Sequence, residues 1–391
     1  MKIGLVLPAL PGYSETFFTN KIKGLHEEGH QVYLFVSRKS RRKFDKVKVI
    51  RGPYISGNLV CNSIVSVWAL LILAFKAPIT AVRFIRLERS DGSSWTNTIK
   101  RLIINSHILA YRLDWLHFGY AAMGVDRELV GRAIGSKTAL SMRGHDIIEF
   151  PLKNPGCYDR LWKNVTKVHT ISDDLLKAAI NLGLPKDIPV TKITPAIEIG
   201  KFYCKRDCLL QHGEINIATV SRLHWAKGLG HVLDALVLLK NKEIKFNYNI
   251  IGKGEEMEYL SFSINQLGLN KNVKLLGKFE HNSIPPMLKR TDIYIQYSLR
   301  EGFCNAVLEA QAAGCLCIVS DAEGLNENVL DGQTGWVVPK RRPDLLAQKI
   351  VEVIHKPQSE LLEISHRAAK RIKAEFNLEK QRKEFVAFYK D

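Results

Sequence analysis

The chain alternates between short apolar runs and longer segments whose apolar residues recur at helical spacing. Apolar runs at Ile3–Leu7 and Val32–Val36 lie on either side of a helical pattern over Thr16–Glu28. Short apolar runs of this kind are typical of buried strands, and Gly29 marks the end of the helical pattern. The order strand, helix, glycine, strand predicts a β-α-β unit with parallel strands.

The same alternation continues along the rest of the chain and predicts an α/β protein with two parallel sheets. Further strands are expected at Trp115–Phe118, Thr138–Met142, Lys167–Thr170, Ile215–Val220, Phe246–Ile251, Val273–Leu276, Ile293–Gln296, Cys315–Val319 and Trp336–Val338. An irregular segment, Pro195–His212, separates the two halves.

The length of 391 residues favours two domains. We expect an N-terminal domain over residues 1–200 and a C-terminal domain over residues 201–375. A helix within residues 376–391 is expected to return to the N-terminal domain. Because ligands of parallel sheets bind at the carboxyl ends of the strands, two such domains predict a ligand site in a cleft between them.

Positive charge is concentrated in the first half of this chain, whose formal net charge is +18. Residues 1–200 contain 29 Lys and Arg against 16 Asp and Glu, a net charge of +13, and the densest run extends from Arg38 to Lys48. A solvated loop, an anionic membrane surface, a phosphorylated acceptor or a nucleic acid would each account for such a run. Nucleic acid is the least favoured partner, because no zinc-finger, RNP or homeodomain pattern accompanies the charge.

The longest apolar stretch, Leu59–Phe75, contains three polar residues and is followed by Lys76, Arg83, Arg86 and Arg89. A spanning helix needs roughly 20 apolar residues, so a buried helix or one lying at a membrane interface is expected. The N-terminal run reads as a first strand rather than a signal peptide, and the seven cysteines include no CxxC pair. These features predict a cytoplasmic protein that is peripheral on the cytosolic face of a membrane.

The strongest local motif is a Glu-Gly-Phe-Cys-Asn sequence that begins at Glu301, after the expected strand Ile293–Gln296. Glu301 is expected before a helix and Glu309 about two turns along it, which places the carboxylates roughly 12 Å apart. That separation is too large for a glycosidase acid–base pair but fits two ends of an extended ligand, with an anion bound at the amides of residues 302–306. Alternatively, Glu301 compensates the helix dipole and Glu309 is a surface residue.

A second motif places Arg222 and Lys227 in the loop after the strand Ile215–Val220. Two cations on a strand-to-helix loop can both bind a diphosphate, since Arg supplies a fork of donors and Lys a compact charge. The alternative is a surface loop with ordinary charges.

Three glycines lie in similar strand-to-helix loops. Gly252 and Gly254 follow the strand Phe246–Ile251, and Gly12 follows the first strand. Each glycine either allows the backbone to approach a phosphate closely or simply permits a tight turn.

Taken together and in order, these motifs resemble the nucleotide-sugar half of family 4 glycosyltransferases, and the likeness covers nearly the whole chain. The residues that carry it in the second half are Arg222, Lys227-Gly228, Gly252-x-Gly254, Glu301-Gly302-Phe303, Glu309-Ala310, Ala313-Gly314, Glu327-Asn328-Val329 and Asp331-Gly332-x-Thr334-Gly335. Those in the first half are Ser14-Glu15-Thr16-Phe17, His117-Phe118-Gly119, Arg143-Gly144-His145-Asp146 and Ile171-Ser172.

The resemblance implies the GT-B fold, in which two Rossmann-like domains face each other across a cleft. It implies a nucleoside-diphosphate sugar donor, such as a UDP- or GDP-sugar, transfer with retention at the anomeric carbon, and no metal. The resemblance implies diphosphate binding by Arg222 and Lys227 and ribose binding by Glu309. Glu301, with the amides of Phe303 and Cys304, would face the donor sugar, and Gly12 would lie under the diphosphate from the other domain. Asn305, Gly252 and Gly254 are further candidate residues for binding the donor.

One departure concerns the reacting sugar. Many family members have His-Gly-x-Asp where this chain has Arg143-Gly144-His145-Asp146. Arg143 then takes the position nearest the reacting sugar, where it would neutralise a phosphate or an acidic sugar. His145 is either a catalytic group or an exposed structural residue.

The function implied by the resemblance is hexosyl-type transfer to a glycan or lipid-linked acceptor in surface polysaccharide or lipopolysaccharide biosynthesis. Two alternatives remain: a soluble small-molecule glycosyltransferase, disfavoured by the basic first half, and a catalytically silent sugar-nucleotide-binding protein, disfavoured by the intact Arg222, Lys227, Glu301 and Glu309 set.

Overall fold

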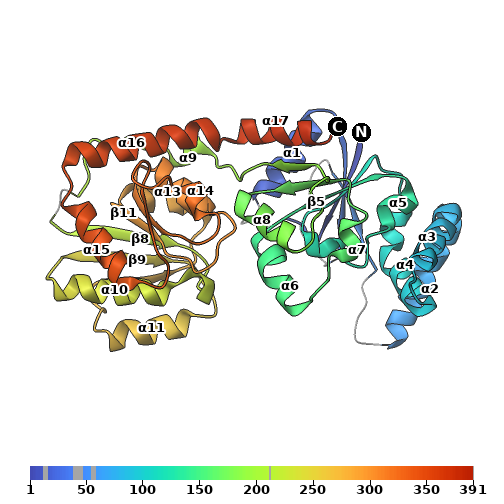
Figure 1. The fold of residues 1–391 in the computed structure, drawn as a ribbon, viewed down its shortest axis with the longest axis horizontal. Coiled ribbons are helices and arrows are strands. Elements are labelled where there is room, and N and C mark those ends of the chain that lie inside the picture. The colour runs from blue at the N-terminus through green and yellow to red at the C-terminus, as the bar shows by residue number, and fades with distance from the viewer. Residues whose placement is uncertain (12–15, 38–46, 54–58, 211–212, 391) are drawn as a thin grey trace. The chain divides into compact units, whose positions relative to one another are not determined.

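The structure is a computed structural model that describes residues 1–11, 16–37, 47–53, 59–210 and 213–390. The chain divides into two compact units (Figure 1). Unit 1 comprises Met1–Ile193 with Arg382–Asp391, and unit 2 comprises Thr194–Gln381. Gly12 and most of the basic run from Arg38 to Lys48 lie outside the described residues.

Unit 1 is built on a parallel sheet with strand order β3-β2-β1-β4-β5-β6-β7. The strands are β1 Lys2–Leu7, β2 Gln31–Val36, β3 Lys48–Arg51, β4 Trp115–Phe118, β5 Lys137–Ser141, β6 Lys167–Thr170 and β7 Val190–Lys192. The helical elements are α1 Thr16–Glu27, α2 Leu59–Lys76, α3 Pro78–Ser90, α4 Trp95–Leu109, η2 Ala121–Gly124, α5 Val130–Ile134, the π-helical turn η3 His145–Glu149, α6 Phe150–Lys153, α7 Asp159–Trp162 and α8 Asp173–Asn181.

Unit 2 repeats the architecture with strand order β10-β9-β8-β11-β12-β13. Its strands are β8 Ile215–Val220, β9 Phe246–Ile251, β10 Val273–Gly277, β11 Ile293–Gln296, β12 Leu316–Ser320 and β13 Trp336–Val338. Its helical elements are α9 Ile199–Phe202, η4 Trp225–Lys227, α10 Leu229–Asn241, α11 Met257–Gln266, η5 His281–Ser283, α12 Ile284–Lys289, α13 Asn305–Ala312, α14 Leu325–Asn328, α15 Pro343–Ile354 and α16 Gln358–Glu375. The last helix, α17 Leu378–Phe388, begins in unit 2 and ends in unit 1.

Strand order changes direction at one point in each sheet. In unit 1 the change lies between β1 and β4, and in unit 2 it lies between β8 and β11. The loops that leave the carboxyl ends of two such strands run to opposite faces of the sheet, which leaves room for a ligand between them. The central strands are buried, and Ile3 is paired on both sides, with Val32 and with Trp115. Each sheet therefore has one expected ligand position.

The nine strands predicted along the rest of the chain are present, as are the first two, with ends that differ by one residue in several cases. The nine include β10 and β13, the edge strands of unit 2. The edge strands β3 and β7 were missed. β7 has only three residues, none of them buried, and β3 has four, none of them buried. Edge strands of this kind carry no continuous apolar run, so the pattern that identifies central strands does not apply to them.

The apolar stretch Leu59–Phe75 forms α2, as a helix that lies at the surface of unit 1 and not in its core. Among the described residues, no single helix is long and apolar enough to cross a membrane. The pair Cys61–Lys76 and Pro78–Ser90 meets that criterion together, but the chain bends by 114° between them.

Candidate functional site

In unit 2, the loops that follow β8 and β11 are held together by backbone hydrogen bonds. The amides of Leu299 and Arg300 both donate to the Ala226 carbonyl, at 2.8 and 3.3 Å. Gly228 ends η4 with φ of +62°, and a Cβ atom there would lie 2.2 Å from the Tyr297 carbonyl oxygen. The absence of a side chain at Gly228 therefore permits the approach that aligns these two loops.

Replacing Gly228 with alanine is expected to destabilise unit 2 by at least ~1–3 kcal/mol, because the added Cβ meets a backbone carbonyl in addition to the strain of a positive φ. Gly332 is the matched control, since it has φ of +68° and nothing within 4 Å of the added Cβ. Denaturant unfolding of both variants measures the difference. Equal losses of stability would mean that the approach to Tyr297 imposes no constraint.

Lys227 and Glu301 form a partly buried ion pair at this junction. The Lys227 ammonium donates to the Glu301 carboxylate, and the two side chains are only 14% and 13% exposed. Burial disfavours the charge on Lys227, but the attraction of Glu301 outweighs it and holds the pKa of Lys227 above its ordinary value. The Ser298 hydroxyl also donates to Glu301, at 3.4 Å, and itself accepts from the Gln296 side-chain amide, at 2.8 Å. Lys227 and Ser298 therefore both hold the Glu301 carboxylate in place.

Arg222 adds an exposed cation to the same site. Its charge opposes protonation of Lys227, which places the two cations near each other. The Arg222 guanidinium forms no hydrogen bond or ion pair with another described residue, and the Ser221 hydroxyl beside it is buried without a described partner. Two cations and one carboxylate leave an excess positive charge at the carboxyl ends of β8 and β11, which suits an anionic ligand.

Gly252 and Gly254 lie against the loop that carries Arg222. A Cβ atom at Gly252 would lie 1.8 Å from the Ser221 carbonyl oxygen, and one at Gly254 would lie 2.0 Å from that of Leu223. Hydrogen bonds join the same loops, from the Leu223 amide to the Lys253 carbonyl at 3.0 Å. In this structure the two glycines therefore shape the backbone of the cation-bearing loop, and direct contact with a diphosphate stays a prediction.

The segment before α13 is held by Asn328. The Asn328 side chain accepts from the Cys304 amide and donates to the Cys304 carbonyl, both at 3.0 Å. Burial raises the pKa of the Cys304 thiol to about 12. The Asn328 side chain engages the Cys304 amide, and contact of this amide with a donor sugar stays a prediction. Phe303 is also buried and lies 5.7 Å from the Phe376 ring, measured between ring centroids.

Asn305 and Glu309 lie on α13, at its first residue and about one turn further in. Glu309 is buried, and its Oε1 lies 3.0 Å from Nε2 of His281. The hydrogen bond from His281 to Glu309 raises the pKa of His281. One oxygen of Glu309 is thus engaged by His281, a residue that no sequence motif had indicated.

In unit 1, Arg143 and His145 follow β5. The Arg143 guanidinium stacks on the Phe17 ring, 3.6 Å from its centroid. His145 is exposed, and its Nε2 lies 3.9 Å from the Glu149 carboxylate. Asp146 is buried and accepts from the Ala121 amide at 3.1 Å, and burial raises the pKa of its carboxyl to about 7. The Arg143 segment is therefore fixed in place by Asp146, while His145 lies on the surface.

Beneath this segment, unit 1 contains a buried polar cluster that sequence reasoning did not anticipate. The His117 ring lies 2.8 Å from the Ser141 hydroxyl, which lies 2.8 Å from His169. The Tyr389 hydroxyl lies 2.7 Å from His117 Nδ1, and the Lys21 ammonium lies 3.2 Å from Nε2. No described carboxylate pairs with Lys21, and burial, followed by the charge of Arg143, lowers its pKa well below the ordinary value.

Comparison with known proteins shows which proteins this chain is similar to. Residues 205–374 match the model described as glycosyl transferases group 1. The chain is 29% identical over 272 residues to the amylovoran biosynthesis glycosyltransferase AmsK of Erwinia amylovora, covering 67% of this chain and 66% of that protein. It is 24% identical over 403 residues to the putative colanic acid biosynthesis glycosyltransferase WcaL of Escherichia coli, covering 96% of each.

The fold is also shared with solved structures. The crystal structure of the Anabaena protein HepE in complex with UDP-glucose superposes with a TM-score of 0.72 at 16% identity, covering 99% of this chain and 98% of that chain. An identity this low shows the fold alone, and the fold is GT-B, as the sequence predicted.

Proposed function

We propose that this chain, whose residues 205–374 match the model of the group 1 glycosyl transferases, is a family 4 glycosyltransferase. It transfers a hexose-type sugar with retention from a nucleoside-diphosphate sugar to a glycan or lipid-linked acceptor. The observation that carries the proposal is the junction of the loops after β8 and β11, where Arg222 lies near the ion pair of Lys227 and Glu301. UDP- and GDP-sugars are the candidate donors, and no metal is required by the proposal. The HepE structure, which has the same fold, is a complex with UDP-glucose, and this supports a UDP-sugar as the donor.

In the proposed site, the donor diphosphate binds between Arg222 and Lys227, and the ribose hydroxyls bind the Glu309 oxygen that His281 leaves available. Glu301 contacts the donor sugar. As the bond from the anomeric carbon to the diphosphate breaks, negative charge develops on the leaving phosphate, and the two cations stabilise it. The acceptor hydroxyl attacks on the same face, and its proton passes to a phosphate oxygen, which accounts for retention.

The acceptor and the place of action are also part of the proposal. Two relatives are named for amylovoran and for colanic acid biosynthesis, which supports a surface polysaccharide or lipopolysaccharide as the product. The net charge of +13 on residues 1–200 supports work at an anionic membrane surface, from the cytosolic side.

In a thermal-shift screen of UDP-, GDP- and ADP-sugars, the sugars of one nucleotide are expected to raise the melting temperature more than the others do. A ligand at 100 times its Kd stabilises the folded state by ~2.7 kcal/mol, which corresponds to a shift of roughly 5–10 °C for a unit of this size. Slow release of nucleoside diphosphate from that donor, without acceptor, then distinguishes an enzyme from a silent binding protein. A panel in which no nucleotide sugar shifts the melting temperature would contradict the proposal.

A further inference from the structure

One helix of unit 1 has its apolar side directed toward solvent. On α2, the exposed side chains are Ile64 (65%), Val67 (58%), Trp68 (66%), Leu71 (44%) and Phe75 (85%), at the spacing of a single helical face. The opposite side of α2 includes the buried residues Ala69 and Leu73. In a surface helix of a globular protein the apolar stripe faces the core, so this orientation leaves a large apolar face without a partner.

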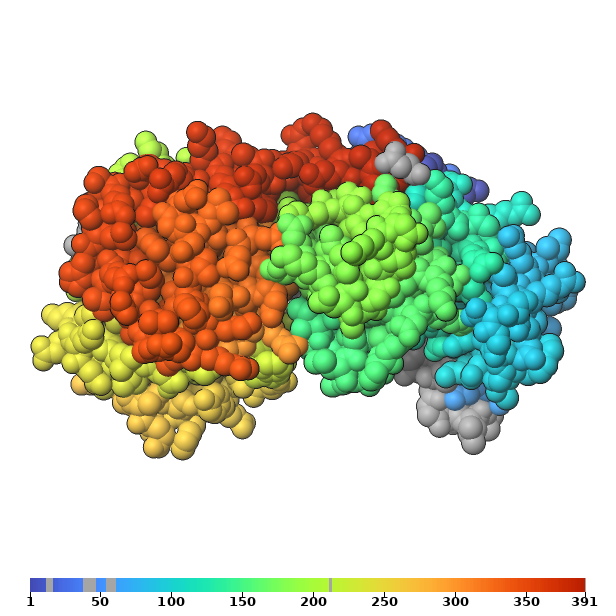
Figure 2. All heavy atoms as spheres, viewed as in Figure 1, coloured from blue at the N-terminus to red at the C-terminus, as the bar shows by residue number. Residues whose placement is uncertain are grey.

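The apolar face continues around the corner into α3 and α4. Phe75 and Ile79, on either side of the 114° bend, are 85% and 83% exposed. Val82 on α3 and Trp95 on α4 are also exposed, at 48% and 59%. We call this surface, over α2, α3 and the start of α4, the outer face. The helices that carry it are the light blue part of unit 1 in Figure 2.

Exposed cations accompany these apolar side chains. They are Lys76, Arg83, Arg86, Arg89 and Lys100, and the guanidinium of Arg89 stacks on Trp95, 4.8 Å from the ring centroid. Residues 59–109 contain only two carboxylates: Glu88, which is buried, and Asp91, which pairs with Arg160. The exposed charge of the outer face is therefore almost entirely positive.

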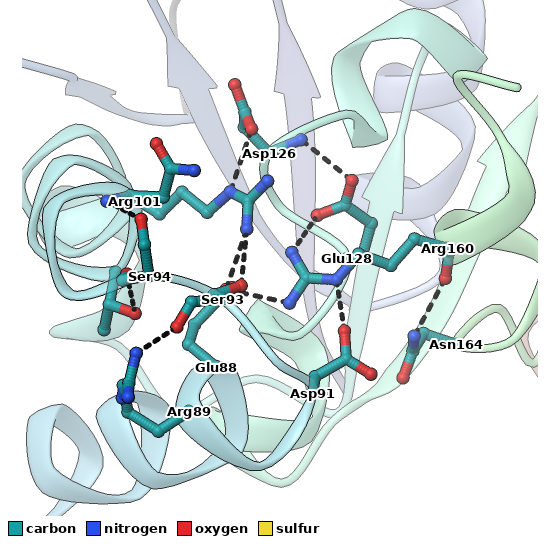
Figure 3. Close-up of polar contacts among 12 residues, drawn as sticks. Glu88, Arg89, Asp91, Ser93, Ser94, Arg101, Asp126, Glu128, Arg160 and Asn164 are labelled. Atoms are coloured by element: carbon teal, nitrogen blue, oxygen red, sulfur yellow. Dashed lines mark hydrogen bonds and ion pairs between the residues drawn. The ribbon is translucent and has the colours of Figure 1, made fainter.

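A network of ion pairs fixes the outer face to unit 1 (Figure 3). The buried Glu88 carboxylate on α3 accepts from Arg101 on α4 at 2.9 Å, from Arg160 on α7 at 2.8 Å and from the Ser93 hydroxyl at 2.7 Å. Arg160 also pairs with Glu128, at 3.3 Å. Because these contacts tie α3 and α4 to the loops of the sheet, the apolar side chains are presented by a supported scaffold.

We propose that the outer face is a docking surface for an anionic membrane. The apolar side chains of α2 and of the corner at Phe75 and Ile79 enter the region between headgroups and acyl chains, with α2 lying in the plane of the membrane. Arg83 and Arg86 remain at the level of the anionic headgroups. The combination of an apolar face with basic residues is that of helices that lie in membrane interfaces.

The charge distribution favours lipid over a second copy of the chain. In a two-fold dimer through this face, the same patch meets itself, so the cations of one copy would face those of the other. An anionic lipid surface neutralises them instead. The membrane is a partner of the transferase proposed above, so this inference rests on that function. The outer face is separate from the residues of the β8–β11 junction.

The test is vesicle binding by the full chain, using phosphatidylcholine with or without about 30 mol% phosphatidylglycerol. Binding is expected only with the anionic lipid. It is expected to fall as salt rises from about 0.1 M to about 1 M, where the Debye length shrinks from ~10 to ~3 Å, and to leave a salt-resistant part due to apolar insertion. Brominated acyl chains are expected to quench the fluorescence of Trp68, which lies on the inserted stripe.

Substitutions on the outer face test whether this surface binds the membrane. The double variant Phe75→Ser and Ile79→Ser is expected to lower the vesicle partition coefficient by at least about tenfold, and both sites are so exposed that folding is preserved. Phe262→Ser, on α11 of unit 2 and 65% exposed, is the matched control and should bind as the unaltered chain does.

Three results would overturn the proposal: no binding to anionic vesicles at low salt, unaltered binding by the double variant, or a lipid-independent dimer that the double variant dissociates. The thermal shift with nucleotide sugars, measured on the same samples, reports separately on the proposed transferase. A variant that loses vesicle binding is expected to keep its donor shift.

Discussion

Replacement of Lys227 with alanine is expected to weaken the binding of a nucleoside diphosphate by ~1.5–3 kcal/mol, the usual size for a charged hydrogen bond. This corresponds to an increase in Kd of roughly 10- to 150-fold. The loss has two causes, because the substitution removes a cation and also leaves the Glu301 carboxylate, 13% exposed, without its ammonium partner and facing an anionic ligand. Isothermal titration with the nucleoside diphosphate measures it.

Glu301→Gln is the matched variant at the other end of the same ion pair. It keeps the volume of the side chain and frees Lys227 for the diphosphate, so affinity for the nucleoside diphosphate is expected to stay the same or to rise. Sugar transfer is expected to fall by about 100-fold or more, since the contact with the donor sugar loses its charge. If both variants weaken diphosphate binding equally, Glu301 serves only to hold Lys227. Unaltered affinity in the Lys227 variant would remove that residue from the site.

Unit 1 is expected to lose stability steeply as pH falls below 6.5. Burial lowers the pKa of His107 to about 3, and it lowers the pKa values of His117 and His169 well below the ordinary value. The unfolded chain therefore binds more protons at acidic pH, and the free energy of unfolding falls as pH falls. Each such proton contributes ~1.4 kcal/mol per pH unit.

Asp146 has the opposite effect on the free energy of unfolding. Between about pH 4 and its folded pKa of about 7, the folded state holds a proton on this carboxyl that the unfolded chain lacks, so this contribution to stability rises as pH falls. Asp146 offsets part of the effect of these three histidines, and the four groups together give the free energy of unfolding a slope of roughly 2 kcal/mol per pH unit near pH 5.5. Urea unfolding followed by the fluorescence of unit 1 at several pH values measures this slope. His107→Phe, which keeps an aromatic ring beside Phe35, is expected to reduce it by about 1.4 kcal/mol per pH unit, and an unchanged slope would exclude His107 as a source.

The amino-acid sequence alone predicted the resemblance to family 4 glycosyltransferases and the central architecture. Interior strands of both sheets, such as Lys2–Leu7 and Leu316–Ser320, are mostly apolar, because both faces of a parallel sheet are buried. The glycosyltransferase motifs are also local, since each occupies one strand-to-helix loop whose chemistry can be read from a few consecutive residues. The roles of Gly12, Gly252 and Gly254 at a diphosphate stay predictions.

Tertiary structure decided how those loops combine. Lys227 and Glu301 are 74 residues apart, and they form an ion pair because strand order reverses between β8 and β11. Contacts of this kind carry no local signal, which is why His281, the partner of Glu309, was missed, and why Asn328 was known only as part of a motif. The orientation of the helix over Leu59–Phe75 also has no local signal. An apolar helix has the same residue pattern whichever side faces the core, and only packing against α4 determined which side faces solvent.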